Sequence, residues 1–352
     1  MAASPALPDG MALAAVDLVK TYSQGRGKPA LRALDGLTFN AEAGTVFGLL
    51  GPNGAGKSTT VKILSTLSRA DSGDAFVAGI DVRRHPERVR SAIGFVAQKQ
   101  VSDPMDTGIE NLVLAGQLHG MSTRAAQSRA GELLERFALT SAARRQVKTY
   151  SGGMARKLDV AIGLMHRPEV LFLDEPTTGL DPEARAEMWA EIERMSREER
   201  MTVLLTTHYL EEADRLASRL AIVDAGKVVT EGTPEQLKSG LRGDAVVIEL
   251  HEASVVPDVL AAIGRFDVLR DVAVEGRTVR ARADEGGAAL PVVLGVLDAD
   301  GLAVASATVS RPSLDDVYLA HTGHTFASAH ASSARAARDH DSASTDLEEV
   351  AS

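Results

Sequence analysis

The feature that most constrains the fold is a glycine-rich loop between a short apolar run and a helical pattern. It follows G-x-x-x-x-G-K-[ST], a motif in which backbone amides and the start of a helix surround phosphate oxygens. Its members are Gly51, Pro52, Asn53, Gly54, Ala55, Gly56, Lys57, Ser58 and Thr59. Residues 45–50 predict a buried strand before it, and residues 57–64 predict a helix after it. This context favours a nucleotide site over a chance Lys-Ser in a flexible turn.

Two side chains of the loop carry chemistry of their own. Lys57 is expected to reach the β- and γ-phosphates, and the Ser58 hydroxyl is expected to ligate Mg²⁺. A second apolar run, residues 170–173, ends in Asp174 and Glu175. Asp174 offers the oxygen ligand that Mg²⁺ prefers, and Glu175 can act as a general base on the attacking water. An apolar run that ends in Asp-Glu is common by itself, but beside the loop it predicts ATP hydrolysis.

Strand and helix patterns alternate along the first two thirds of the chain. Residues 103–148 predict a helical region, 188–195 an amphipathic helix and 202–206 a third buried strand. Such alternation predicts an α/β fold with a mostly parallel sheet. After about residue 240 the order becomes βαββαβ, which is typical of a ferredoxin-like α+β domain. Its predicted elements are residues 245–250, 255–263, 266–274, 278–283, 288–297 and 302–309.

Composition excludes several classes of protein. The 352 residues are 44% hydrophobic, enough for about two domains, and they include no cysteine, which excludes disulfides and thiolate metal sites. The formal net charge of −10 disfavours a broad nucleic-acid-binding role. No apolar stretch approaches the ~20 residues that span a bilayer, and residues 1–10 lack a signal-peptide pattern. We therefore expect a cytoplasmic chain that reaches a membrane only by docking onto another protein.

A third motif, Ser-Gly-Gly, completes a known series. Ser-Gly-Gly alone indicates a flexible loop, although at a helix start it can bind phosphate. In order and spacing, the series resembles the ABC (ATP-binding cassette) ATPase family. The motifs that carry the resemblance are the glycine-rich loop, Ser151-Gly152-Gly153, the strand ending in Asp174-Glu175, Thr177-Thr178-Gly179-Leu180-Asp181-Pro182, and His208. The resemblance implies a P-loop NTPase cassette, with a parallel sheet core and antiparallel and helical subdomains.

The resemblance also assigns roles to single positions. Tyr22 matches the aromatic residue that stacks on adenine, although it also fits a strand end. Gln98 matches the glutamine that senses Mg²⁺ and the attacking water and couples to the membrane partner. His208 matches the histidine that contacts the γ-phosphate, although a lone histidine is ordinarily a surface or core residue. Asp181 matches the aspartate that crosses the dimer interface, and Ser151 begins the segment that contacts ATP held by a second subunit.

One departure from the commonest family motif makes the chain resemble one branch of the family. The commonest family motif is Leu-Ser-Gly-Gly-Gln, whereas this chain has Tyr150 and Met154 at the two ends, and a methionine cannot replace the hydrogen bonds of Gln. This variant, followed by residues 156–159 (Arg-Lys-Leu-Asp), resembles the daunorubicin-resistance branch of drug-export ATPases. Residues 311–318 (RPSLDDVY) resemble the end of that branch. The resemblance covers about residues 12–325.

These observations predict four segments. Residues 1–10 form a flexible leader, and residues 11–240 form the ATPase domain, whose helical subdomain spans about 100–165. Residues 241–325 form the small C-terminal α+β domain, and residues 326–352 form a disordered tail because they hold few large apolar residues.

The leading functional hypothesis is an ATP-hydrolysing subunit of a drug or antibiotic exporter. The resemblance implies a homodimer that closes on ATP and Mg²⁺ at the cytoplasmic face of the membrane, with two copies of a separate permease and no nucleic acid. Export of another substrate, such as a lipid or polysaccharide, remains an alternative, as does a soluble ABC ATPase not engaged in transport. Lys57 and Ser151 are too close in sequence for the long coiled coils of DNA-repair members, and the chain has one P-loop where ribosome-acting members usually have two. A protein that binds ATP without hydrolysing it would lack Glu175 or His208.

Overall fold

The computed structural model describes residues 10–23, 29–252, 256–264, 269–326 and 328–329. These residues fall into two compact units, Met1–Thr233 and Pro234–Ser352. The leader expected at residues 1–10 lies outside the described residues except for Gly10.

A six-stranded sheet forms the centre of the first unit. Its strands are β3 (Val46–Leu50), β6 (Ile93–Val96), β7 (Val170–Asp174), β8 (Thr202–Thr207), β9 (Arg219–Asp224) and β10 (Lys227–Gly232), in the order β10-β9-β3-β8-β7-β6. All neighbouring pairs are parallel except β9 and β10. Every residue of β3, β7 and β8 is buried, because helices or a second sheet cover both faces. The mostly parallel sheet expected from sequence is confirmed.

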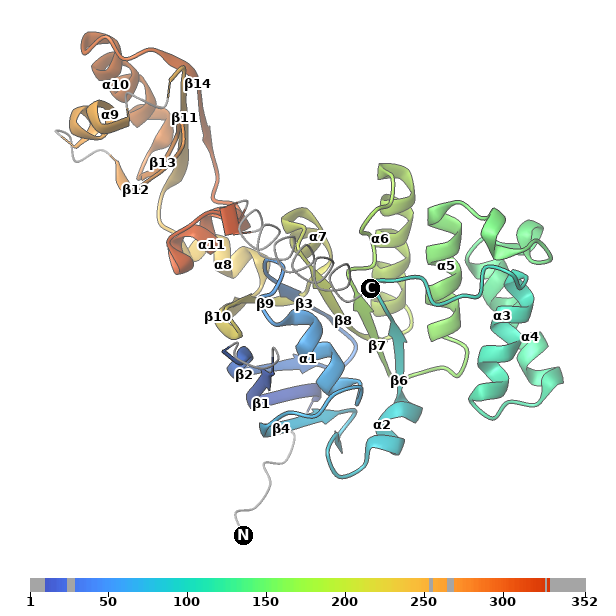
Figure 1. Ribbon diagram of the computed structural model, residues 1–352. Coiled ribbons are helices and arrows are strands. Elements are labelled where there is room, and N and C mark those ends of the chain that lie inside the picture. The colour runs from blue at the N-terminus through green and yellow to red at the C-terminus, as the bar shows by residue number, and fades with distance from the viewer. Residues whose placement is uncertain (1–9, 24–28, 253–255, 265–268, 327, 330–352) are drawn as a thin grey trace, which may run out of the picture. The chain divides into compact units, whose positions relative to one another are not determined.

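A second, antiparallel sheet packs on helix α1 and one face of this sheet (Figure 1). It has the order β2-β1-β4-β5, and its core packing includes stacked Phe39 and Phe47 rings, with centroids 5.0 Å apart. Its strands are β1 (Met11–Tyr22), β2 (Leu31–Glu42), β4 (Ser72–Val77) and β5 (Ile80–Asp81). The helices of this part of the chain are α1 (Lys57–Leu64) and α2 (Pro86–Ala92).

Helices α3 (Gly108–Leu118), α4 (Thr123–Arg136) and α5 (Gly152–Gly163) form a helical subdomain (Figure 1). Two short 3₁₀ turns, Thr140–Ala142 and Val147–Thr149, connect α4 to α5. Buried leucines of these helices share one apolar core with α6 (Pro182–Arg197), and α7 (Leu210–Leu216) follows β8.

The second unit contains a four-stranded antiparallel sheet. Its elements are α8 (Pro234–Gly240), β11 (Asp244–Leu250), α9 (Val256–Ile263), β12 (Arg270–Glu275), β13 (Thr278–Ala283), α10 (Gly286–Ala299), β14 (Val304–Ser310) and α11 (Leu314–Thr322). From β11 to β14 they follow the βαββαβ order expected from sequence, and the strands lie in the order β12-β13-β11-β14. Buried residues of α9 and α10 pack on one face of the sheet.

Two expected boundaries differ from the structure. The first compact unit ends at Thr233, so α8, which the expected boundary at residue 240 places in the ATPase domain, belongs to the second unit and packs on α11. The expected tail begins at residue 326, but Phe326 is buried and its ring meets Tyr318 edge-on at 5.0 Å. An apolar ring with a partner of this kind lies within the folded unit. Residues 330–352 lie outside the described residues.

Candidate active site

The parallel strands bring the sequence motifs to one edge of the central sheet. The glycine-rich loop follows β3, His208 follows β8, Asp174 and Glu175 stand at the end of β7, and Gln98 follows β6. These four strands are consecutive neighbours in the sheet, and their carboxyl ends point the same way. Ligands of open α/β sheets bind at this edge, beyond the carboxyl ends of the strands.

Steric contacts explain two glycines of the loop. A Cβ at Gly51 would lie 2.3 Å from the Val223 carbonyl oxygen. Gly56 has φ of +109°, and a Cβ there would lie 2.7 Å from the Ala33 carbonyl oxygen. Helix α1 begins directly after Gly56 with no side-chain cap, so its first amide groups face the loop as donors for an anion.

Lys57 lies inside this loop with only 4% of its surface exposed. Its Nζ donates to the carbonyl oxygens of Gly51 at 2.7 Å and Pro52 at 3.1 Å, and lies 3.7 Å from Glu175 Oε1. Burial lowers the pKa of Lys57 below its usual range, against the opposing attraction of Glu175 and Asp174. The ammonium group is therefore held where the loop, the strand end and α1 meet.

Glu175 is the centre of the cluster. The Gln98 side-chain amide donates to Glu175 Oε2 at 2.9 Å, and His208 Nδ1 lies 3.1 Å from the same oxygen. Burial raises the pKa of Glu175, but His208, Lys57 and Thr178 outweigh it, so the pKa lies below its usual value. A carboxylate with a lowered pKa is ionised at neutral pH, which is the form that a general base requires.

The donor set beside Glu175 fits a hard cation. Ser58 Oγ lies 3.2 Å from Asp174 Oδ1, which also accepts from Thr206 Oγ1 at 2.6 Å. Mg²⁺ prefers oxygen ligands, and three are at hand: the Ser58 hydroxyl, the Asp174 carboxylate and the Gln98 amide oxygen. Mg²⁺ sites usually complete their coordination shell with water and substrate phosphates. The described part of the chain holds no group of three or more His, Cys, Asp or Glu side chains that could bind a metal ion.

Arg156 supports the site, although the sequence motifs assigned it no role. It is 7% exposed, and its guanidinium donates to the carbonyl oxygens of Ala97 at 2.5 Å, Pro176 at 2.8 Å and Asp174 at 3.2 Å. One side chain on α5 thus holds both the segment before Gln98 and the turn that contains Glu175. The sequence placed Arg156 in the branch-specific segment that follows Ser151 but gave no sign of these contacts.

Thr206 was also missed by the sequence analysis. Besides its bond to Asp174, its hydroxyl accepts from the Glu175 backbone amide at 3.1 Å. Glu175 has φ of +49°, a left-handed conformation that is uncommon outside glycine. Thr206 therefore helps to hold the turn in which both carboxylates stand.

Other expected site residues lie apart from this cluster. Ser151 and Asp181 are exposed and cap α5 and α6, accepting from the amides of Met154 and Ala184. Tyr22 ends β1, with Lys20 Nζ 5.4 Å from its ring centroid. Within the described ranges, no hydrogen bond or ion pair joins these three residues to Lys57 or Glu175.

The two glycines after Ser151 differ in their surroundings. A Cβ at Gly153 would lie 2.8 Å from the Ala184 side chain, so Gly153 lets α5 pack closely on α6. A Cβ at Gly152 would meet nothing within 4 Å. Close packing within the chain therefore accounts for Gly153 but not for Gly152.

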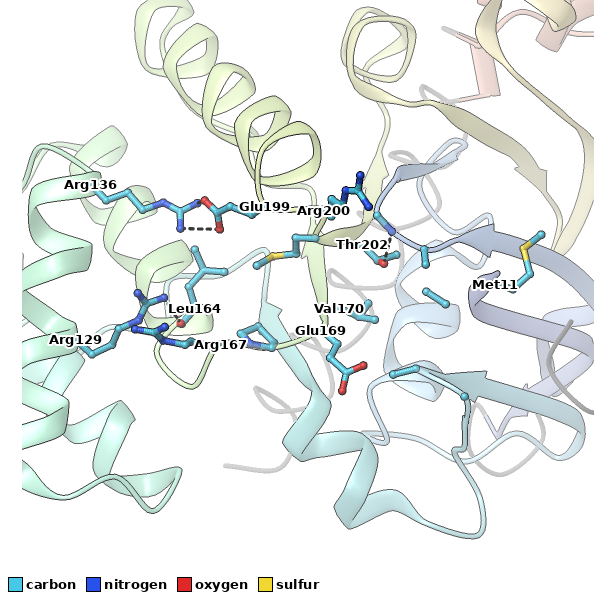
Figure 2. A pocket seen from close by; sticks show the side chains of 17 residues that line it. Met11, Arg129, Arg136, Leu164, Arg167, Glu169, Val170, Glu199, Arg200 and Thr202 are labelled. Atoms are coloured by element: carbon cyan, nitrogen blue, oxygen red, sulfur yellow. Dashed lines mark hydrogen bonds and ion pairs between the residues drawn. The ribbon is translucent and has the colours of Figure 1, made fainter. Parts of the chain in front are cut away.

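A cavity of about 800 Å³ lies at the opposite edge of the sheet, where β7 and β8 begin (Figure 2). Its lining includes Arg129 and Arg136 of α4. Arg136 pairs with Glu191 at 2.7 Å and Glu199 at 2.9 Å, which links the helical subdomain to α6 and the segment after it. This cavity contains none of the residues of the nucleotide cluster.

Known proteins are similar to this chain in sequence and fold. A family model described as "ABC transporter" matches residues 34–178. The daunorubicin resistance ATP-binding protein DrrA2 of Streptomyces coeruleorubidus is 45% identical over 317 residues, covering 90% of this chain and 96% of that protein. The chain belongs to the daunorubicin-resistance family of ABC transporter ATP-binding proteins. The ABC ATPase fold and ATP hydrolysis expected from the sequence are thereby confirmed.

Two further similarities extend this result. The linearmycin resistance ATP-binding protein LnrL of Bacillus subtilis is 36% identical over 318 residues, covering 89% of this ABC protein and 99% of LnrL. The ATP-binding cassette MJ0796, solved as a dimer bound to ADP and Pi, matches with a TM-score of 0.58 and 26% identity over 63% of this chain and 98% of that one. Among the helices that the structure describes, none combines the length and apolar character needed to cross a membrane.

Proposed function

We propose that this ABC protein drives efflux of drugs or antibiotics through a separate membrane permease. The observation that carries the ATPase part is the convergence of Lys57, Gln98, Glu175 and His208 at one sheet edge. The drug-export part is supported by similar proteins named for resistance to daunorubicin and linearmycin.

The residues of the cluster divide the chemistry of hydrolysis among them. The loop amides and Lys57 bind the phosphates of ATP, and the ionised Glu175 accepts a proton from the attacking water. Ser58, Asp174 and Gln98 would hold Mg²⁺, which neutralises charge on the phosphates. His208 contacts the γ-phosphate from the end of β8. Because Lys57 lies 3.7 Å from Glu175, a phosphate group competes with this carboxylate for the ammonium and leaves Glu175 for water.

Two copies of the chain complete the site. Ser151 and Gly152 are exposed, with open space beside Gly152, so that the start of α5 can approach ATP bound by a second copy. Asp181 at the start of α6 crosses the interface, and Tyr22 stacks on adenine. The dimer of MJ0796 supports this arrangement.

The permease contact lies on the helical subdomain, in the region from Gln98 to Leu118. Leu118 is 80% exposed and Leu114, one helical turn earlier, is 49% exposed. Large apolar side chains that lie together on a surface mark sites of protein contact. A cavity of about 320 Å³ adjoins Leu118 and is lined by further apolar side chains, including Leu67 and Phe95. Two permease copies, docked at this region of the two chains of the dimer, hold the ATPase at the cytoplasmic face of the membrane.

Co-expression tests the exporter. A drug-sensitive host should accumulate less daunorubicin, in an ATP-dependent way, only when it contains both this chain and a permease of the daunorubicin-resistance class. Leu118→Glu should abolish both membrane fractionation and efflux while the ATPase activity of the purified protein remains. Leu260→Glu, which changes an exposed leucine of the second unit, is the matched control. If the chain alone conferred full resistance, the exporter hypothesis would be wrong, and drug sequestration or target protection would have to explain the resistance.

A further inference from the structure

The segment that carries Gln98 has little support from its own backbone. Residues 98–102 follow the end of β6 and belong to no helix or strand, and no backbone–backbone hydrogen bond within the described part of the chain involves them. The Gln98 side chain nevertheless donates to Glu175 Oε2 at 2.9 Å. A segment of this kind keeps a side chain in place only when contacts from other elements restrain it.

One restraint comes from Asp159 of α5. The Asp159 side chain is 2% exposed, and its Oδ1 accepts from the Ser102 backbone amide at 3.0 Å. Ser102 is also buried, at 4% exposed, so removal of the carboxylate would leave its amide without a good acceptor. Asp159 therefore fixes the far end of the segment.

The surroundings of Asp159 show which contacts offset its burial. Burial raises the pKa of Asp159, whereas hydrogen bonds from Ser102 and Val101 and the charge of Arg156 oppose this rise. A carboxyl group buried without such partners would be costly. Its contacts with the backbone of residues 101–102 thus contribute to keeping it in this place.

Arg156 restrains the other end of the segment from the same face of α5. Its guanidinium donates to the Ala97 carbonyl oxygen at 2.5 Å, and helix residues that are three apart, as Arg156 and Asp159 are, lie side by side. Gln98 therefore lies between two points that are both attached to α5. Asn111 of α3 binds the backbone of Asp103, which attaches the next residue to the helical subdomain as well.

We propose that Asp159 is a positioning residue for ATP hydrolysis, which fixes residues 98–102 so that Gln98 lies beside Glu175. Within the described residues, Asp159 has no hydrogen bond or ion pair with Lys57 or Glu175, so it acts through Gln98. The proposal rests on the role proposed above for Gln98. The sequence analysis included Asp159 only as the last residue of the branch-specific segment 156–159.

Amide hydrogen exchange of the nucleotide-free, full-length protein tests the contact itself. Relative to its intrinsic rate, the Ser102 amide should exchange at least about 10-fold more slowly than the exposed Lys99 amide, which has no acceptor in the part of the chain that the structure describes. Asp159→Ala should remove this protection. Equal exchange of the two amides in the wild type, or protection that persists in Asp159→Ala, would overturn the proposal.

A double-mutant cycle tests the consequence for hydrolysis. Asp159→Ala should lower kcat about 10-fold and change the KM for ATP less than about 2-fold, because the phosphate-binding loop is untouched. Gln98→Ala should lower kcat about 10-fold or more. The double variant should be no slower than Gln98→Ala, because Asp159 has no side chain left to position.

The cycle separates positioning from a general structural role. Lys157→Met, which changes a partly exposed neighbour on α5, is the control and should keep the wild-type kcat. If Asp159→Ala lowers kcat by the same factor with and without Gln98, the positioning role is wrong and the role of Gln98 stands. If Gln98→Ala hydrolyses ATP as fast as the wild type, the role of Gln98 is wrong and the proposal fails with it. The exchange measurement on the wild type keeps the test decisive if Asp159→Ala does not fold.

Discussion

The two edges of the central sheet use the same kinds of charged side chain in different ways. At the carboxyl edge, Lys57 and Glu175 are 4% and 8% exposed and their ion pair is part of a closed cluster. At the amino edge, Arg136 is 15% exposed, and its partners Glu191 and Glu199 are 14% and 33% exposed. Solvent reaches the second network mainly at Glu199 and is more fully excluded from the first, so removal of one charge should be more costly at the carboxyl edge.

The largest expected effect is that of Lys57→Ala. Loss of the phosphate-binding ammonium should reduce ATP hydrolysis by ~10³-fold or more, about 4 kcal/mol of transition-state stabilisation, and should weaken ATP binding. Steady-state hydrolysis and nucleotide binding by the purified protein measure both effects. Wild-type turnover would exclude the loop as the phosphate site.

Glu175→Gln should slow hydrolysis by about 10²- to 10³-fold and leave ATP binding intact, because the amide keeps the shape of the side chain and cannot accept the proton. The stalled protein should accumulate as an ATP-bound dimer in size-exclusion chromatography. A monomer that still hydrolyses ATP would contradict both the base and the dimer.

Arg156→Met should act on stability. Three carbonyl oxygens lose a buried charged donor, at a cost of about 3 kcal/mol, which corresponds to a fall of roughly 5–10 °C in the melting temperature. Lys157→Met is the matched control, since Lys157 pairs with Glu187 at a partly exposed site. Equal melting temperatures for the two variants would show that the Arg156 contacts contribute little.

The smallest expected effect belongs to the amino edge. Arg136→Gln should cost about 1 kcal/mol of stability and leave ATP hydrolysis unchanged, because its ion pairs are partly screened by solvent. Calorimetry at low salt and at 1 M salt should show a difference from wild type that shrinks as salt is added. A loss as large as that of Arg156→Met would remove the distinction between the two edges.

The nucleotide cluster was largely predictable because its motifs are local. The loop at 51–59 and the Asp-Glu pair each follow a buried apolar strand, and parallel strands bring their carboxyl ends together. The supporting contacts were not predictable in this way. Arg156 binds the Ala97 carbonyl across 59 residues of sequence, and Thr206 binds Asp174 across 32. Such pairs depend on how the helical subdomain and β8 pack, which no local pattern records.

The second unit shows the same division. The sequence pattern predicted its strands and helices and their order along the chain, and each strand buries one face in the core. A bulge in β12 has no signature of Gly or Pro, and Asp271 adopts φ of +51° there. The boundary at Thr233 was missed because α8 contacts α11, some 80 residues later in the chain, and tertiary packing assigns it to the second unit.

The backbone of Glu175 has a consequence for the evolution of this protein. A left-handed φ of +49° costs a non-glycine residue on the order of 1 kcal/mol, and glycine would adopt it freely. Glycine would relieve this strain but would also remove the carboxylate that lies beside Lys57 and His208, and loss of one charge from a buried pair costs more than the strain. The strained turn after β7 therefore serves both stability and turnover, and directed evolution of thermostable variants would be expected to keep Glu175 and to improve other sites.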